Sequence, residues 1–247
     1  MMDLIDTFLN WTYIAEVLPD LLGTGLVNTL ILAGFSAVLG TVLGLGIAVM
    51  GLSRSRWLRW PARVYTDIFR GLPSIVTILL VGQGLALAAR PIVGTDPYPL
   101  GILALSLIAA AYIGEIFRSG IQSVDKGQLE AARAVGMTYS QAMRLILIPQ
   151  GIRRVLPALV NQFISLVKDS SLVYFLGLLA EQRDLFRIGQ DLAANTGNLS
   201  PLVAAGLLYL AITVPLTHLV NHIDRRLRDN KRIARAKPSV SATVQAR

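Results

Sequence analysis

Four stretches of this sequence contain no Asp, Glu, Lys or Arg over lengths close to or above a bilayer crossing. They cover positions 21–53, 71–89, 97–114 and 192–223. A helix needs about 20 mostly apolar residues to cross the hydrocarbon core of a membrane. Charged residues make up only 15% of the chain, compared with about 25% in soluble domains. We therefore predict a membrane protein with several spans and exclude a soluble globular enzyme.

The hydrophobic pattern predicts five transmembrane helices, at residues 23–52, 66–89, 99–117, 155–179 and 199–220. Lys168 and Asp169 interrupt the fourth span, whose other residues are typical of a mostly buried helix. The segments between the spans alternate in charge: those after the first and third spans and the C-terminal segment are basic, and the others are neutral or acidic. Because Lys and Arg stay on the cytoplasmic side, the alternation predicts an all-α membrane protein with its N-terminus outside and its C-terminus in the cytoplasm.

The hydrophobic and charge pattern divides the chain into three predicted parts. Residues 1–20 carry apolar side chains at helical spacing between positions 4 and 18 and predict an amphipathic helix on the outer surface. Residues 21–225 form the transmembrane domain, and residues 226–247 form a basic cytoplasmic tail that is disordered from Pro238 onward. In the first span, Gly40 and Gly44 form a G-x-x-x-G pattern that permits close helix contact, and we favour contact within the chain over a dimer seam.

The charge and composition exclude several functions. The net charge is +8, but the segment from His222 to the end holds eight Lys or Arg against two Asp, and the remaining excess lies in loops. That distribution orients a membrane protein and does not indicate nucleic-acid binding. The chain has no cysteine and no G-x-x-x-x-G-K-[ST] phosphate loop, so it cannot cradle ATP by that route. We expect no catalytic residue, metal site or cofactor in this chain.

The segment between the third and fourth spans, residues 118–154, is too polar to enter lipid. It predicts a helix over 130–135 that ends at Gly136, since helices commonly end at glycine. Ser140 is expected to cap a second short helix, which Pro149 stops before the fourth span. The segment is predicted to expose small residues (Ala131, Ala132, Gly136) beside apolar ones (Val135, Met137, Tyr139), so that a partner can approach closely. Long loops with their own structure are usually functional.

This segment resembles the signature loop of the permease subunits of bacterial ATP-binding-cassette (ABC) importers. The resemblance rests on Glu130-Ala131-Ala132, Gly136 after three further residues, and Ile146-Leu147-Ile148-Pro149. Motifs elsewhere are similar to the polar amino acid branch of these permeases, namely Arg70-Gly71-Leu72-Pro73, Glu115–Ile121, Gly127–Glu130 and Leu166–Leu172.

The resemblance implies a membrane-embedded permease subunit of the bacterial cytoplasmic membrane. It implies transport of a polar amino acid, such as glutamine or glutamate, arginine or histidine. The implied partners are a dimer of ABC ATPase subunits that bind ATP and magnesium, a second permease copy or paralogue, and an extracytoplasmic solute-binding protein. The residues expected to couple the permease to the ATPase are Glu130, Ala131, Ala132, Val135, Gly136 and Met137.

Polar groups inside spans are costly and tend to be functional. Asn161, Ser165 and Asp169 lie at intervals of four positions, near one face of the fourth helix, with Lys168 beside them. Together with Gln83 and Tyr112 they are candidates for a substrate pathway. Lys168 and Asp169 can instead have a structural role, paired with each other or with neighbouring helices. Glu115 and Arg118 are expected to form a structural ion pair.

Two other functional classes remain open on the residues alone. An ion-coupled secondary transporter or a channel subunit also needs charge within the membrane, but such a transporter usually shows internal repeats, and the ordered 118–154 segment would have no role. An intramembrane metalloenzyme is disfavoured, because His218 and His222 lack the glutamate of the H-E-x-x-H pattern.

Overall fold

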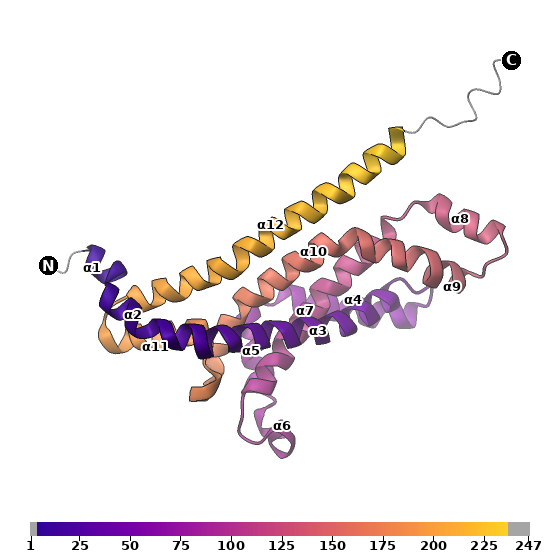
Figure 1. Cartoon of the computed structure of the whole chain (residues 1–247). Helices are drawn as coiled ribbons and strands as arrows, with labels where there is room; N and C mark the ends of the chain where they lie inside the picture. Colours follow the sequence, from indigo (N-terminus) through magenta and orange to yellow (C-terminus); the bar gives the residue numbers. More distant parts are fainter. Residues whose placement is uncertain (1–3, 237–247) are drawn as a thin grey trace.

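The computed structural model describes residues 4–236 and, for side chains, residues 4–225. The described chain is mostly helical and contains no strand (Figure 1). The predictions for residues 1–3 and 237–247, including the disorder expected at the C-terminus, lie outside the described residues. The helices in chain order are α1 (Leu4–Leu9), α2 (Trp11–Asp20), α3 (Leu26–Gly51), α4 (Arg56–Gly71), α5 (Ser74–Gly82), α6 (Ala86–Val93), α7 (Tyr98–Gln122), α8 (Lys126–Ala134), α9 (Tyr139–Ala142), α10 (Ile148–Asp169), α11 (Leu185–Thr196) and α12 (Ser200–Ala236). Short π-helical turns at Leu21–Gly25 and Met143–Leu147 and 3₁₀ helices at Ser170–Leu176 and Ala180–Gln182 complete the path.

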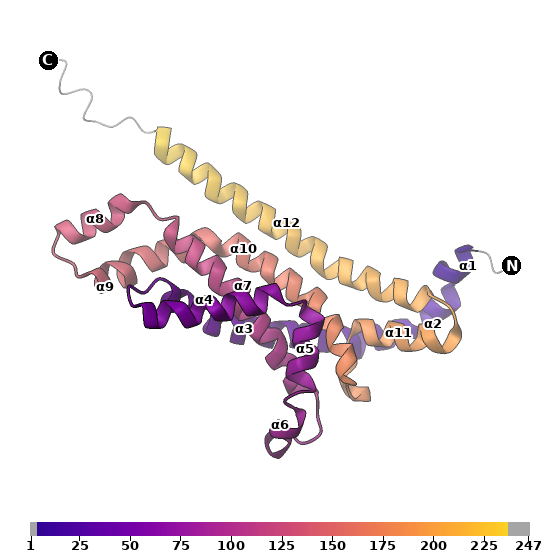
Figure 2. The same cartoon turned by 180° about the vertical axis from the view of Figure 1, so that it is seen from behind.

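The two ends of the elongated bundle carry different parts of the chain. Both views place α8, α9 and the C-terminal end of α12 at one end, and α1, α2 and α11 at the other (Figures 1 and 2). Helix α12 has 37 residues, a length of about 55 Å, which exceeds the roughly 30 Å hydrocarbon core. It therefore extends beyond the membrane, and residues 226–236 of the predicted tail continue this helix.

The centre of the core is the contact between α3 and α7. A Cβ atom added at Gly40 would lie 2.6 Å from the Cβ of Ala109, and one at Gly44 would lie 2.9 Å from the carbonyl oxygen of Ala110 and from the amide nitrogen of Gly114. The backbones can approach this closely only because glycines occupy both positions. The predicted use of G-x-x-x-G for packing within the chain is confirmed.

The structure does not reproduce all five predicted spans as single helices. Among the described residues, three helical stretches are long and apolar enough to cross a membrane: Leu4–Gly51, Tyr98–Gln122 and Ser200–Arg225. Helix α10, which covers most of the fourth predicted span, is not one of them; it carries Arg153 and Arg154 near its start and ends at Asp169. The number of five spans therefore stays a prediction.

The second predicted span, residues 66–89, is wrong as a single straight helix. Helices α4 and α5 reach the length and hydropathy of a span only together, and they are bent by 108°. The bend falls at Leu72, which is extended (ψ 142°) before Pro73. A residue before proline is driven out of the helical region by steric conflict with the proline ring. Beyond Gly82 the chain enters α6, which projects from the bundle (Figure 1).

The N-terminal segment, predicted as an amphipathic helix on the outer surface, forms the two helices α1 and α2. Helix α2 continues through the π-helical turn into α3, and only α1 is separate, because the chain breaks at Asn10, whose side chain accepts a hydrogen bond from the amide of Thr12 (3.0 Å). Val17 and Leu21 are buried against Leu185 of α11 and Ala205 of α12. Residues 11–20 therefore extend the first long helix, which these tertiary contacts hold in place.

A buried polar cluster joins α3, α11 and α12 at the α11 end of the bundle. The side chain of Asp184, which is fully buried, accepts hydrogen bonds from the amide of Arg187 (2.9 Å) and the hydroxyl of Tyr209 (3.2 Å). The amide of Leu185 donates to the hydroxyl of Thr29 (3.1 Å), and the Asn28 amide group donates to the carbonyl of Glu181 (2.9 Å). These bonds fix the start of α11 to α3 and α12.

The stability of the protein should depend on the protonation of Asp184. Burial raises the pKa of this carboxyl to about 6, and the hydrogen bond from the Arg187 amide only partly offsets that effect. The folded state therefore holds a proton that the unfolded chain has already lost, so this stabilisation is complete below about pH 4 and is lost as the pH rises through about 6. The loss is at most about 3 kcal/mol. Asp184→Asn should remove this pH dependence; thermal unfolding of both proteins between pH 4 and 8 measures it, and identical pH profiles would contradict it.

Candidate functional site

The loop between α7 and α10 contains the predicted helix and a defined turn at Gly136. Asp125 caps the start of α8 by accepting a hydrogen bond from the amide of Gly127 (2.7 Å). At the other end the amide of Met137 donates to the carbonyl of Ala132 and that of Gly136 donates to the carbonyl of Arg133, both at 3.1 Å. This pair of bonds is the Schellman motif, which requires a left-handed residue. Gly136 supplies it with φ +87°.

Two local predictions about α9 are wrong. The cap is Thr138 and not Ser140: the Thr138 hydroxyl accepts from the amide of Gln141 (3.2 Å), and the Gln141 side chain accepts from the amide of Thr138 (2.8 Å). This reciprocal capping box satisfies two amides at once, which Ser140 alone cannot do. Pro149 does not stop the helix; it lies in the first turn of α10, where its missing N–H is not needed.

The six predicted coupling residues differ in exposure. Glu130, Ala131, Val135 and Gly136 are exposed, and Met137 is half-buried. Val135 is 75% exposed although it is apolar. Ala132 was expected to be exposed but is buried, with 3% of its surface accessible. Its place on the inner face of α8 explains the difference, so Ala132 contributes to the packing of the loop and does not offer a free surface.

The loop is tied to the bundle at several points. Ile121, Val124 and Leu147 form a small apolar cluster beneath it. The guanidinium of Arg154 in α10 donates to the carbonyl of Ser123, and the guanidinium of Arg54, before α4, lies 4.5 Å from the ring centre of Tyr139. These contacts join the loop to α7, to α10 and to the segment just before α4.

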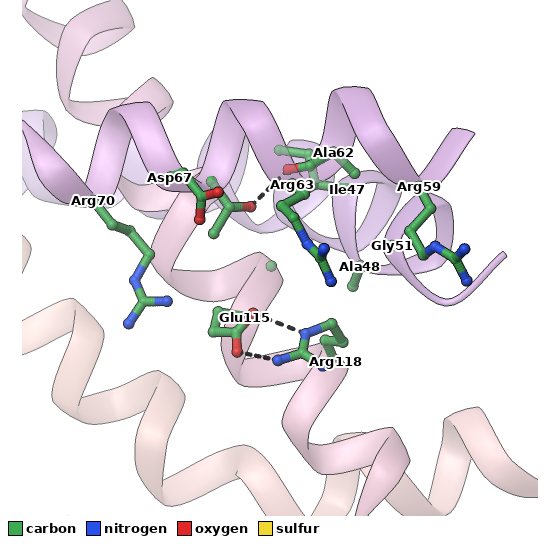
Figure 3. Close-up of a pocket in the computed structure, with 12 residues that line it drawn as sticks. Ile47, Ala48, Gly51, Arg59, Ala62, Arg63, Asp67, Arg70, Glu115 and Arg118 are labelled. Carbon is green, nitrogen blue, oxygen red and sulfur yellow. Dashed lines mark hydrogen bonds and ion pairs between the residues drawn. The ribbon is translucent and has the colours of Figure 1, made fainter. Parts of the chain in front are cut away.

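A cavity of about 220 Å³ lies between α3, α4 and α7 near the loop end. Arg59, Arg63, Asp67 and Arg70 line it from α4 and face α7 (Figure 3). On α7 the Arg118 guanidinium donates to both carboxylate oxygens of Glu115, with 2.9 Å for the Nε bond. The predicted Glu115–Arg118 ion pair is thus confirmed.

The predicted pathway residues are not gathered into one pocket of the described chain. Asn161 and Lys168 are exposed on α10, while Ser165 and Asp169 are half-buried. The guanidinium of Arg70 lies 5.4 Å from the ring centre of Tyr112 in α7. Gln83 is exposed at the end of α5. Within the described residues Lys168 and Asp169 form no ion pair with each other. Their role in transport stays a prediction.

Two features of the structure were not predicted from the sequence. The first is the row of arginines on α4, whose helical spacing (Arg56, Arg59, Arg63, Arg70) is present in the sequence. From the sequence alone these residues were explained as the basic charge of a cytoplasmic loop and, for Arg70, as part of a family motif. The buried Asp184 cluster gave a weaker signal, an Asp directly before an apolar helical pattern, which is typical of a helix cap.

Comparison with known proteins identifies the class of the chain. Residues 40–229 match the family described as binding-protein-dependent transport system inner membrane component. The chain belongs to this family.

Particular relatives narrow the comparison to amino acid systems. The arginine transport system permease protein ArtQ of Bacillus subtilis (strain 168) is 37% identical over 83% of this chain and 92% of its own length. The glutamate/aspartate import permease protein GltK of Escherichia coli O6:H1 is 36% identical over 88% of this chain and 97% of its own length. A crystal structure of an amino acid ABC transporter with histidines superposes with a TM-score of 0.75 at 34% identity, covering 89% of this chain and 98% of that one.

A more distant solved structure shares the fold. The MetNI methionine ABC transporter in an inward-facing conformation gives a TM-score of 0.71 at 24% identity, over 83% of this chain and 95% of that chain. Taken together, the family match and the amino acid relatives support an ABC permease over the secondary transporter and the channel considered from the sequence.

Proposed function

We propose that this chain is the permease subunit of an ATP-driven importer that carries a polar amino acid across the bacterial inner membrane. The single observation that supports this most strongly is the rigid loop at one end of the bundle. It exposes Ala131, Val135 and Gly136 on a short helix and turn whose position is fixed by capping and by contacts with three helices. Two ABC ATPase subunits supply the energy, and ATP and magnesium bind to them and not to this chain.

The topology proposed is five spans with the N-terminus outside. Helices α3, the bent α4–α5 pair, α7, α10 and α12 are the five, with residues 1–20 before the transmembrane domain of residues 21–225 and the basic segment 226–247 after it. The separation of α1 and α11 from α8 and α9 at opposite ends of the bundle supports this arrangement (Figures 1 and 2).

Coupling follows from the contacts of the loop. The ATPase contacts the surface formed by Glu130, Ala131, Val135 and Gly136, and closure of the ATPase dimer therefore displaces α8 and α9. Ala132 keeps α8 packed, and the backbone amide of Met137 holds the turn by donating a hydrogen bond to the carbonyl of Ala132. Because the loop is bonded to α7 and α10, its movement changes the angle between those helices and opens the pathway to one side or the other.

The pathway forms when a second permease, a copy or a paralogue, pairs with this one. The polar residues of α10 (Asn161, Ser165, Lys168, Asp169), with Gln83 and Tyr112, are proposed to line it. A zwitterionic amino acid presents a carboxylate and an ammonium group, which Lys168 and Asp169 complement in charge. An extracytoplasmic solute-binding protein delivers the substrate at the α11 end.

Transport by the reconstituted assembly tests this function. Proteoliposomes would contain this chain, its ATPase subunits, its binding protein and any paralogous permease, with labelled glutamine, glutamate, arginine and histidine outside. At least one amino acid should accumulate with ATP enclosed and not without it. Uptake that proceeds without ATP, or that follows an imposed ion gradient, would contradict the proposal and favour a secondary transporter or channel.

A further inference from the structure

Helix α4 has one face packed in the bundle, a basic face that borders the cavity toward α3 and α7, and an apolar face that is exposed on the outside of the described chain. Ala62 is buried, the Tyr65 hydroxyl donates to the carbonyl of Leu107 (2.8 Å), and the rings of Tyr65 and Phe69 lie 4.5 Å apart. These contacts hold α4 against α7. The apolar face of the helix must therefore be covered by something outside this fold or face its surroundings.

The face that borders this cavity carries basic side chains. Arg56, Arg59 and Arg63 are exposed, and none of them forms an ion pair with a carboxylate among the described residues. Together with Trp60 they line a hollow of about 150 Å³. Asp67, one turn further along, lines the neighbouring cavity and not this hollow. Three unpaired guanidinium groups around one hollow form a site for an anion with several oxygens.

The exposed outer face is apolar. Trp57 is 90% exposed and Trp60 is 69% exposed, which is unusual for the largest apolar side chains. With Pro61 and Arg56 they line a second hollow of about 520 Å³. The two hollows share Arg56 and Trp60. A basic hollow therefore lies directly beside an apolar one on the same helix.

We propose that this face of α4 binds an anionic glycerophospholipid of the cytoplasmic leaflet. Its phosphate group is held by Arg56, Arg59 and Arg63, and its acyl chains lie over Trp57, Trp60 and Pro61. Tryptophan favours the boundary between hydrocarbon and headgroups, and arginine near an anionic leaflet is attracted to its lipids. The inference rests on the topology proposed above, in which the start of α4 lies on the cytoplasmic side.

The proposed lipid site is in contact with the loop between α7 and α10. Arg54, two residues before α4, contacts the ring of Tyr139 in α9. Arg59 and Arg63 line both the basic hollow and the cavity that Glu115 and Arg118 line from α7. A lipid seated there fixes the start of α4 beside the surface that the ATPase moves, so anionic lipid should support coupling as well as binding.

Lipid binding can be measured without any transport, which separates this proposal from the proposed function. The full chain in its assembly with the ATPase subunits would be titrated with phosphatidylglycerol or phosphatidylcholine and examined by native mass spectrometry. The assembly should retain phosphatidylglycerol in preference to phosphatidylcholine. In Arg56→Gln/Arg63→Gln the affinity for phosphatidylglycerol should fall about fivefold for each arginine removed, about 25-fold in total.

A matched variant controls for net charge. Arg90 in α6 and Arg153 in α10 are exposed basic residues outside this face of α4 and outside the loop between α7 and α10, and Arg90→Gln/Arg153→Gln should keep the wild-type lipid affinity. An equal loss in both double variants, or equal retention of the two lipids by the wild type, would overturn the proposal. Displacement of phosphatidylglycerol by an equal concentration of inorganic phosphate would show a free phosphate site. Binding to the isolated chain that disappears on assembly would show a protein interface, and either result would also overturn the proposal.

Discussion

Replacing Gly136 with aspartate is expected to abolish ATP-driven uptake while the permease remains inserted in the membrane. Gly136 has φ +87°, a left-handed conformation that costs an L-residue roughly 1–2 kcal/mol. The new carboxylate also lies just beyond the C-terminus of α8, where negative charge is unfavourable. It would project from the exposed surface that we assign to the ATPase. Co-purification of the ATPase subunits and uptake should both fall about tenfold or more, as is usual for a central interface residue.

Gly197 provides a matched control for this substitution. It follows α11 as Gly136 follows α8, its φ is +66°, and, as at Gly136, a Cβ atom added there meets nothing within 4 Å. Gly197→Asp thus imposes the same backbone strain at the opposite end of the bundle, and it should leave ATPase co-purification unchanged. Normal ATPase binding and uptake by Gly136→Asp would contradict the coupling role of the loop.

Replacing Gly44 with valine is expected to destabilise the folded protein. A Cβ atom at this position would lie 2.9 Å from two backbone atoms of α7, and backbone atoms cannot move aside as a flexible side chain can. Overpacking of a tight core costs roughly 1–3 kcal/mol, and sometimes more. The unfolding temperature should fall by about 5 °C or more.

Gly46 lies two residues further along the same helix and serves as the control. A Cβ atom added there meets nothing within 4 Å, while the change in helix propensity is the same. Thermal unfolding in detergent should therefore separate Gly44→Val from Gly46→Val. Equal stability of the two variants would show that the contact between α3 and α7 is not as close as described.

The parts of this fold that could be predicted from sequence depend on local patterns. The spacing of Gly40 and Gly44 indicated a close helix contact, and the Glu115–Arg118 spacing indicated an ion pair; both are confirmed. The helix that ends at Gly136 follows from helix propensity and from the conformational freedom of glycine. In each case the interaction lies within one helical turn or follows from one residue type.

The features that were missed depend on contacts between distant segments. The burial of Val17 depends on α11 and α12, which belong to the C-terminal part of the chain. The buried carboxyl of Asp184 is satisfied partly by Tyr209 from another helix. The cap at Thr138 was missed for a different reason: both Thr138 and Ser140 are good capping residues, and only the reciprocal bond with Gln141 distinguishes them. The pathway residues on α10 stay a prediction because their proposed partner surface belongs to a second permease.

Site-directed cross-linking tests most directly the claim that the Gly136 surface contacts the ATPase. The chain contains no cysteine, so single cysteines can be introduced at Val135 in the loop and at Leu4 at the opposite end, which are both 75% exposed. In the assembled importer, Val135→Cys should cross-link to the ATPase subunit with a short thiol-to-amine reagent, with a yield that changes on ATP binding, and Leu4→Cys should not. Cross-linking from Leu4→Cys, or none from Val135→Cys, would contradict the account.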